Sequence, residues 1–165
     1  MGCLIIYNIF LMEVYMILAI GSDHAGYDLK KEIIKYLEEQ NIEYVDFGTC
    51  SCDSVDYPDY GLKVAEAVKE GKCEKGIVIC GTGLGISMAA NKVPGIRAAV
   101  CTNSYMAKMA TEHNDCNVLA LGARVVGVGL ALDIVETWLS SEFEGGKHKK
   151  RVDKISEIEK KYYKD

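Results

Sequence analysis

Short apolar runs alternate with amphipathic stretches along most of the chain. The runs are bounded by turn residues and fall at residues 17–20, 42–47, 77–79, 98–101 and 118–121. Runs of this kind predict short strands buried on both faces of a sheet. The stretches between them place apolar residues at helical spacing, as Leu29, Ile33 and Leu37 do. The alternation predicts an α/β fold: a three-layer, Rossmann-like doubly wound sandwich with a five-stranded parallel sheet.

The remaining helices are expected from the same spacing. Leu62, Ala65 and Val68 predict a helix over about 60–70, after a turn-rich loop at 48–59. Another helix is expected from Thr102 or Asn103 to about His113. Residues 126–139 predict a long amphipathic helix, and a charged helix is expected to reach about residue 163.

The length and the composition set the class of protein. A chain of 165 residues suits one domain, which we expect over residues 16–165 with a C-terminal helical tail. Residues 1–15 are interpreted as an N-terminal extension outside the core. Residues 3–20 are largely apolar, which raises a membrane span or a signal peptide as an alternative, but Glu13 interrupts the run and its end serves as the first strand. No membrane association is expected.

Charge and cysteine usage narrow the function further. The net charge is −5 and no basic stripe with aromatic residues is present, so nucleic-acid binding is not expected. The seven cysteines are an odd number without a C-x-x-C pair, which favours a reducing cytoplasm over a disulfide framework. With only three histidines, no metal site is expected.

The stretch that carries the most chemistry follows the third predicted strand. Cys80-Gly81-Thr82-Gly83-Leu84-Gly85 reads as the end of a strand, a tight glycine turn and the start of a helix. Glycines let the backbone pass close to a ligand, and the N–H groups of a helix's first turn favour an anion. A cysteine beside a helix N-terminus is favoured as thiolate. The stretch therefore offers a base or nucleophile beside a cradle for an oxyanion.

Two alternatives stand beside this interpretation. Buried cysteines are commonly small apolar residues of the core, and many glycine turns hold no ligand. The stretch also lacks the lysine of a P-loop, and Ile86 stands where the dinucleotide-binding pattern requires glycine.

Other polar residues are predicted to lie at the same edge of the sheet. Asp23 and His24 follow the first strand, and Arg124 follows the fifth. Ligands of doubly wound sheets bind beyond the carboxyl ends of the strands. A base, an oxyanion cradle, histidines and cations suit the isomerisation of a phosphorylated sugar through an enediolate, a reaction that needs no cofactor.

Each side residue also has a purely structural explanation. Asp23 and His24 can cap the first helix, and His113 can cap the end of another. Arg124 can be a surface charge, and the basic run 147–151 can be a solvated tail.

Five motifs, in order over about residues 16–160, closely resemble the ribose-5-phosphate isomerase type B family, which includes the RpiB, LacA and LacB sugar-phosphate isomerases. They are Gly21-Ser22-Asp23-His24-Ala25-Gly26, Val55-Asp56-Tyr57-Pro58-Asp59-Tyr60, the Cys80–Gly85 turn, His113-Asn114, and Phe143-Glu144-Gly145-Gly146-Lys147-His148-Lys149-Lys150-Arg151.

The resemblance implies an isomerase that interconverts ribose 5-phosphate and ribulose 5-phosphate in the pentose phosphate pathway. It implies that Cys80 moves the proton between C1 and C2, that Thr82 and the turn hold the enediolate, and that His113 and Asp23 assist ring opening. The substrate-binding residues that it implies are Asp23, His24, Tyr57, Gly81, Thr82, Gly83, Leu84, Gly85, Asn114, Arg124, Lys147 and Arg151. It further implies a homodimer or homotetramer in which His113, Asn114 and the tail reach the neighbouring subunit's Cys80.

The chain departs from the family pattern at two places. Lys147 stands where arginine is usual, which keeps the charge but loses the bidentate fork. Residues 1–15 have no counterpart in the family, and some relatives use a glutamate in place of the cysteine base. The alternatives are an isomerase of a six-carbon sugar phosphate, such as galactose 6-phosphate or allose 6-phosphate, a phosphosugar-binding module without turnover, and a redox sensor built on the cysteines.

Overall fold

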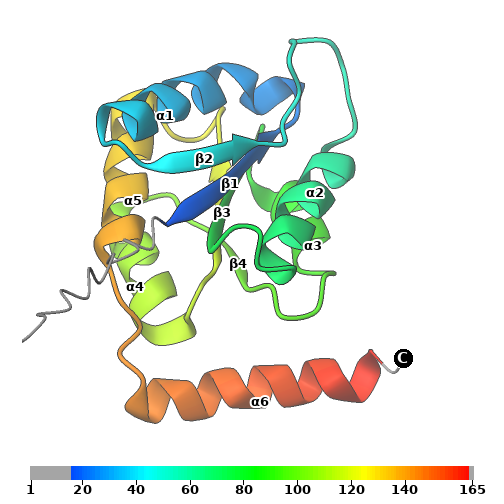
Figure 1. Ribbon diagram of the computed structural model, residues 1–165, viewed down its shortest axis with the longest axis vertical. Coiled ribbons are helices and arrows are strands. Elements are labelled where there is room, and N and C mark those ends of the chain that lie inside the picture. The colour runs from blue at the N-terminus through cyan, green and yellow to red at the C-terminus, as the bar shows by residue number, and fades with distance from the viewer. Residues whose placement is uncertain (1–15, 164–165) are drawn as a thin grey trace, which may run out of the picture.

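The five predicted strands form one parallel sheet in the computed structural model, which describes residues 16–163. The sheet order is β2-β1-β3-β5-β4 (Figure 1). The strands are β1 (Ile17–Ser22), β2 (Glu43–Asp46), β3 (Lys75–Cys80), β4 (Ala98–Val100) and β5 (Val118–Gly122). The interpretation of residues 1–15 as an extension concerns residues outside this described range.

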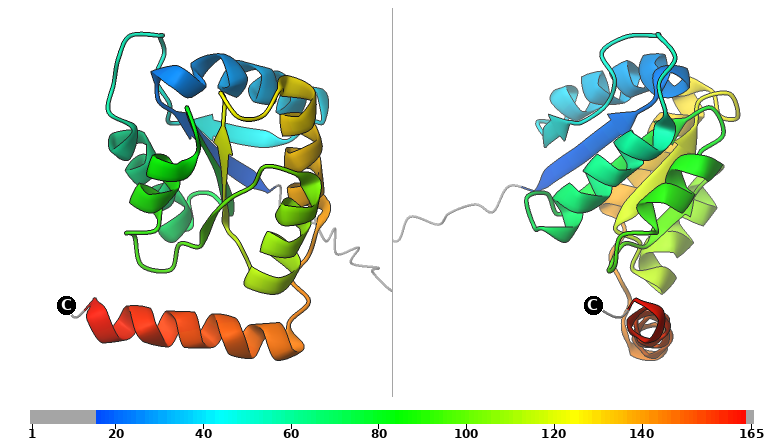
Figure 2. Two further views of the ribbon diagram at one scale, coloured as in Figure 1. Left: turned by 180° about the vertical axis from the view of Figure 1, so that it is seen from behind. Right: turned by 90° about the vertical axis from the view of Figure 1, so that its right-hand side faces the viewer.

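Helices cover both faces of the sheet, as expected for a doubly wound sandwich. One face carries α1 (Tyr27–Glu39), α4 (Ser104–Asn114) and α5 (Val128–Ser140), and the other carries α2 (Tyr57–Lys69) and α3 (Leu84–Ala90) (Figures 1 and 2). A short 3₁₀ turn, η1 (His24–Gly26), joins β1 to α1. The three-layer α/β fold and the five-stranded parallel sheet are confirmed.

The core consists of two apolar layers that the sheet separates. Successive strand residues point to opposite faces, so Leu18 and Ile20 join the layer under α1, α4 and α5, while Ala19 joins the layer under α2 and α3. Because helices cover both faces of the sheet, the central strands are buried on both sides and consist of continuous apolar runs.

The helix boundaries differ from the sequence prediction at two places. The helix predicted from residue 60 begins at Tyr57, because Pro58 fits the first turn, where its missing N–H costs nothing. Leu62, assigned to the buried spacing, is 43% exposed, and that face is formed instead by Gly61, Val64 and Ala65. The helix predicted from residue 126 begins at Val128.

The last helix, α6 (Gly146–Tyr162), lies apart from the layers, beyond the edge at which the strands begin (Figure 1). It is held to the domain near its end, where the Glu159 carboxylate accepts hydrogen bonds from the Gly95 N–H at 2.9 and 3.0 Å. Within residues 16–163, no helix combines the length and the apolar character that crossing a membrane requires.

Candidate active site

The turn after β3 brings a thiol and a set of backbone N–H groups together. Cys80 is 5% exposed, and its Sγ accepts a hydrogen bond from the Gly83 N–H at 3.2 Å. Gly83 has a φ of +80°, a left-handed conformation that favours glycine. This conformation turns its N–H back toward the sulfur.

Of the N–H groups that follow, that of Leu84 donates to Thr82 Oγ1, whereas those of Gly85 and Ile86 have no hydrogen-bond partner within the described residues. The carbonyls of Cys80 and Gly81 accept from Ala123 and Arg124 at 2.9 and 3.0 Å. These two carbonyls are therefore bound by the loop after β5. The first N–H groups of a helix, in contrast, have no hydrogen-bond partner inside that helix. The turn and the start of α3 thus present N–H groups at the place where the sequence predicts a cradle for an oxyanion.

Asp23 and His24 lie at the end of the neighbouring strand β1, which pairs with β3 up to Ser22 and Ile79. The Asp23 carboxylate accepts from the Gly26 N–H at 3.0 Å, so it caps η1, the structural role considered for it. His24 Nδ1 accepts from the Val55 N–H at 3.2 Å, which links the ring to the loop before α2 rather than to a helix end.

Tyr57 and Arg124 flank the cradle on two sides. A Cβ built on Gly85 would lie 2.6 Å from the Tyr57 ring, so the ring packs directly against this glycine. The Arg124 guanidinium lies 3.5 Å from the corresponding position on Gly81 and makes no ion pair with the described part of the chain. Thr82 is exposed on the turn, and its Oγ1 accepts from the Leu84 N–H at 3.3 Å.

The remaining predicted site residues lie at the opposite edge of the sheet. His113 and Asn114 end α4, which runs back from the carboxyl edge, and Asn117 shortly after them accepts from the N–H of Gly76 near the start of β3. Cys80 ends the same strand, so the length of β3 separates the two groups by about 16 Å. Lys147 and Arg151 lie on the first turns of α6 and are exposed there.

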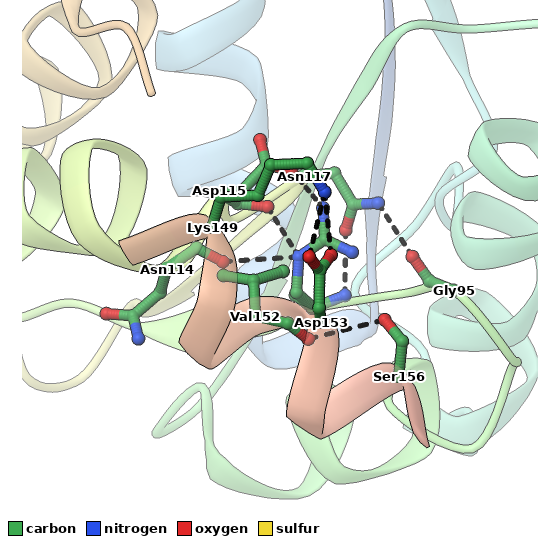
Figure 3. Close-up of polar contacts among 9 residues, drawn as sticks. Gly95, Asn114, Asp115, Asn117, Lys149, Val152, Asp153 and Ser156 are labelled. Atoms are coloured by element: carbon green, nitrogen blue, oxygen red, sulfur yellow. Dashed lines mark hydrogen bonds and ion pairs between the residues drawn. The ribbon is translucent and has the colours of Figure 1, made fainter. Parts of the chain in front are cut away.

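Figure 3 shows the surroundings of Asn114. Its backbone carbonyl and that of Asp115 accept from Arg97 Nε at 3.2 and 2.7 Å, while its side-chain amide points away from this network. The amide is thereby presented to solvent, beside α6.

The structural explanation for His113 was that it caps the end of α4, but the capping residue is Asp115. The left-handed Asp115 ends α4, and the His113 ring stacks on His148 with centroids 4.0 Å apart and planes 6° from parallel. His148 is 5% exposed, and burial together with the nearby His113 and Lys147 lowers the pKa of its imidazole. Glu144 Oε2 lies 3.4 Å from His148 Nε2 and 3.9 Å from His113 Nε2.

His148 and Glu144 belong to the last of the five motifs, but neither is among the site residues that the sequence predicts. His148 and Glu144 are four residues apart, a spacing that signals contact within a helix, but His113 lies far away in sequence and only the fold brings it to them. Ser22, also unassigned, is fully buried at the end of β1, and its hydroxyl has no hydrogen-bond partner among the described residues.

Two chemically different groups therefore exist at opposite edges of one sheet. The carboxyl edge holds a thiol, a carboxylate, an imidazole and an N–H cradle. The amino edge holds exposed lysine and arginine side chains beside a pair of imidazoles. Neither group alone supplies a base, an oxyanion cradle and a phosphate clamp together.

Comparisons with known proteins identify the family. The profile of the ribose/galactose isomerase family matches residues 18–155. Ribose-5-phosphate isomerase B of Escherichia coli (strain K12) is 51% identical over 144 residues, covering 87% of this chain and 97% of its own length.

Solved structures agree as well. Ribose-5-phosphate isomerase B of Clostridium thermocellum is 71% identical, with a TM-score of 0.88 over 89% of this chain and 99% of that one. The Mycoplasma genitalium ribose-5-phosphate isomerase B with bound ribulose-5-phosphate is 42% identical, with a TM-score of 0.85 over 88% of this chain and 97% of that one. By its sequence, its fold and the five motifs around its two sheet edges, this chain belongs to the ribose/galactose isomerase family.

Proposed function

We propose that this protein interconverts D-ribose 5-phosphate and D-ribulose 5-phosphate through an enediolate, without a cofactor, within the pentose phosphate pathway. The observation that carries the proposal is the Cys80 sulfur, which accepts a hydrogen bond from the Gly83 N–H beside the backbone N–H groups of the glycine turn. Membership of a family with a relative described with bound ribulose-5-phosphate supports the same reaction.

The central step moves one proton between neighbouring carbons. In this proposal the Cys80 thiolate takes the proton from C2 of the open-chain aldose and returns it to C1. The negative charge that develops on the oxygen is met by N–H groups of residues 81–85 and by the Thr82 hydroxyl, which are already oriented before reaction. A preorganised cradle of this kind stabilises the enediolate more than the sugar itself.

Ring opening and phosphate binding combine Asp23 and Arg124, at the same edge as Cys80, with groups from the other edge of the sheet. His113 and Asp23 exchange the protons that open the ring, and Asn114, Arg124, Lys147 and Arg151 bind the sugar or its phosphate. Since about 16 Å of strand separates His113 from Cys80 in one chain, these groups meet only when two copies contribute to one site. The active enzyme in this proposal is therefore a homodimer, or a tetramer built from such dimers.

The surface of α6 supports association between copies. Ile155, Ile158 and Tyr162 follow one another at helical spacing and are 48%, 60% and 72% exposed. Figure 2 shows that α6 stands off the layers of the domain. An exposed apolar stripe on such a helix is typical of a subunit contact.

The substrate range is tested by assaying the purified protein, with a chelator present, on ribose 5-phosphate, galactose 6-phosphate and allose 6-phosphate. The expected result is a kcat/KM for the pentose phosphate well above that for either hexose phosphate. A preference for a hexose phosphate would establish the six-carbon alternative. Binding of all three sugars without turnover would establish the phosphosugar-binding module.

The cysteines bear on the cellular location of the enzyme. We place the enzyme in the cytoplasm, because all the cysteines within residues 16–163 are free thiols. Residues 16–165 are proposed to act as one catalytic domain with a helical tail. A redox sensor receives less support, because Cys73, Cys80, Cys101 and Cys116 are buried.

A further inference from the structure

A cluster of two imidazoles and a carboxylate lies where the end of α4 meets the segment before α6. His113 Nε2, His148 Nε2 and Glu144 Oε2 are all within 4.8 Å of one another. The backbone fixes Glu144 in this place, because its N–H donates to the Glu112 carbonyl at 3.0 Å. The three side chains thus converge from two separate segments of the chain.

The buried histidine is incompletely satisfied. The His148 side chain is 6% exposed, and its Nε2 makes no hydrogen bond within the described residues, although the Glu144 carboxylate lies 3.4 Å away. A buried nitrogen without a hydrogen-bond partner is costly and uncommon in folded proteins. The Glu144 side chain is 52% exposed and that of His113 is 39% exposed, so a small ion can reach this nitrogen from solvent.

We propose that His113, Glu144 and His148 form a binding site for one divalent transition-metal ion of the zinc class. Imidazole nitrogen and carboxylate oxygen are ordinary zinc ligands, and three protein ligands leave a fourth position for water. Donor atoms of a tetrahedral zinc ion lie about 3.3 Å apart, so the cluster must contract slightly. Because the two rings are nearly parallel, one of them must also tilt to turn its lone pair toward the ion.

The surrounding charge limits the affinity. Lys147 adjoins His148, and Arg151 lies one helical turn further along α6. These cations repel a metal ion, so we expect a dissociation constant on the order of micromolar rather than nanomolar.

The ion would act as an inhibitor rather than as a cofactor. It would hold the imidazole of His113 as a ligand and fasten the end of α4 to the start of α6. This consequence rests on the proposed function, in which His113 opens the sugar ring, whereas metal binding itself does not.

The test measures metal binding by the purified chain carrying Cys3→Ser, Cys50→Ser and Cys52→Ser, which removes Cys3 and the two exposed thiols. Cobalt(II) is titrated and followed by its visible absorption, and zinc(II) is then added as a competitor. The expected result is one ion per chain, with affinity at least tenfold weaker in Glu144→Gln and in His148→Asn. The control is His24→Asn, which changes the one histidine outside the cluster and should leave the affinity for cobalt unchanged.

Two results would overturn the site: no binding below millimolar cobalt, or binding that is unchanged in both variants. Glu144 is exposed, so Glu144→Gln remains informative even where His148→Asn fails to fold.

A second measurement separates this proposal from the proposed function. Zinc should inhibit isomerisation and a chelator should restore it, and Glu144→Gln should need at least tenfold more zinc. Metal binding without inhibition would keep the site and reject the role of His113 in ring opening.

Discussion

At the scale of single residues, the cradle depends on a glycine whose conformation no other residue adopts easily. Gly83 has a φ of +80°, and a Cβ at this position would meet the Leu121 carbonyl carbon at 3.0 Å. Its N–H is the group that reaches the Cys80 sulfur. The hydrogen bond to the thiol therefore depends on the backbone conformation of Gly83.

The first prediction concerns this glycine. Gly83→Ala should lower the free energy of unfolding by about 1–2 kcal/mol, because an L-residue is strained at this φ, and it should also lower kcat. Denaturant unfolding and the isomerase assay measure the two effects. Gly129→Ala is the matched control, because Gly129 lies in α5 with open space around it and should tolerate the change or gain stability. Equal behaviour of the two variants would contradict the assignment.

The residues of the turn could be predicted from the sequence because glycine spacing and a strand end are local signals. The contact between His113 and His148 could not, because it depends on how α4 and α6 meet. Leu62 was misplaced for a related reason: helical spacing gives a periodicity, but the contacts of α2 with the sheet and with α3 decide which side of the helix is buried.

The second prediction concerns two buried thiols and alkaline pH. Burial raises the pKa of Cys101 to about 12, with the adjacent Cys116 adding to the effect, and burial also raises the pKa of Cys116. The folded protein then keeps these protons at a pH where the unfolded chain, with thiol pKa values near 8.5, has lost them. The free energy of unfolding should therefore fall as the pH rises above about 8.5.

Denaturant unfolding between pH 7 and pH 11 measures this loss. Cys101→Ala should be less stable at pH 7 but should lose less stability over the alkaline range. Cys52→Ala, at an exposed thiol, should follow the unmodified protein. Parallel curves for all three proteins would exclude these buried thiols as the cause.

At the scale of elements, a buried lysine connects α1 to β2 and to the loop that leads to the site. Lys30 is 2% exposed and forms an ion pair with Asp46, and its Nζ also donates to the Thr49 carbonyl at 2.9 Å. The loop continues to Val55, whose N–H binds His24. The sequence does not reveal this contact, because a lysine beside the apolar face of a helix is ordinarily solvent-exposed and nothing near it marks Asp46 as its partner.

The third prediction tests this connection. Lys30→Met should lower the free energy of unfolding by about 1–3 kcal/mol, because it leaves the partly buried Asp46 and the Thr49 carbonyl without their partner. It should also raise the KM for ribose 5-phosphate by loosening the loop that holds His24. Lys31→Met is the control, since its ion pair with Asp28 is exposed and should contribute little. A Lys30→Met protein as stable as the control would reject the account.

At the scale of the whole molecule, the parallel sheet keeps the two halves of the proposed site apart. Every strand runs in the same direction, so residues after strands gather at one edge and residues at the ends of returning helices gather at the other. The fold class follows from the alternation of apolar runs, but assembly does not, because one chain's sequence carries no record of how two copies meet. Oligomerisation thus completes the site in the proposed function.

The fourth prediction tests that sharing. A Cys80→Ala chain and a His113→Ala chain, each inactive alone, should recover about a quarter of the wild-type activity when they are refolded together in equal amounts. Random pairing makes half of the dimers mixed, and each mixed dimer holds one intact site out of two. No recovery, with mixed dimers demonstrated by native mass spectrometry, would place each site within one chain.

The most direct test of the central claim compares the intact protein with Cys80→Ala on ribose 5-phosphate in the presence of a chelator. The account predicts full activity of the intact protein with the chelator and a loss of about 10²–10⁴-fold in kcat for the variant. Cys73→Ala, at a thiol that is 2% exposed in the same apolar layer, should keep its activity. A Cys80→Ala protein that isomerises at the rate of the intact protein would move the proton transfer to another residue and contradict the account.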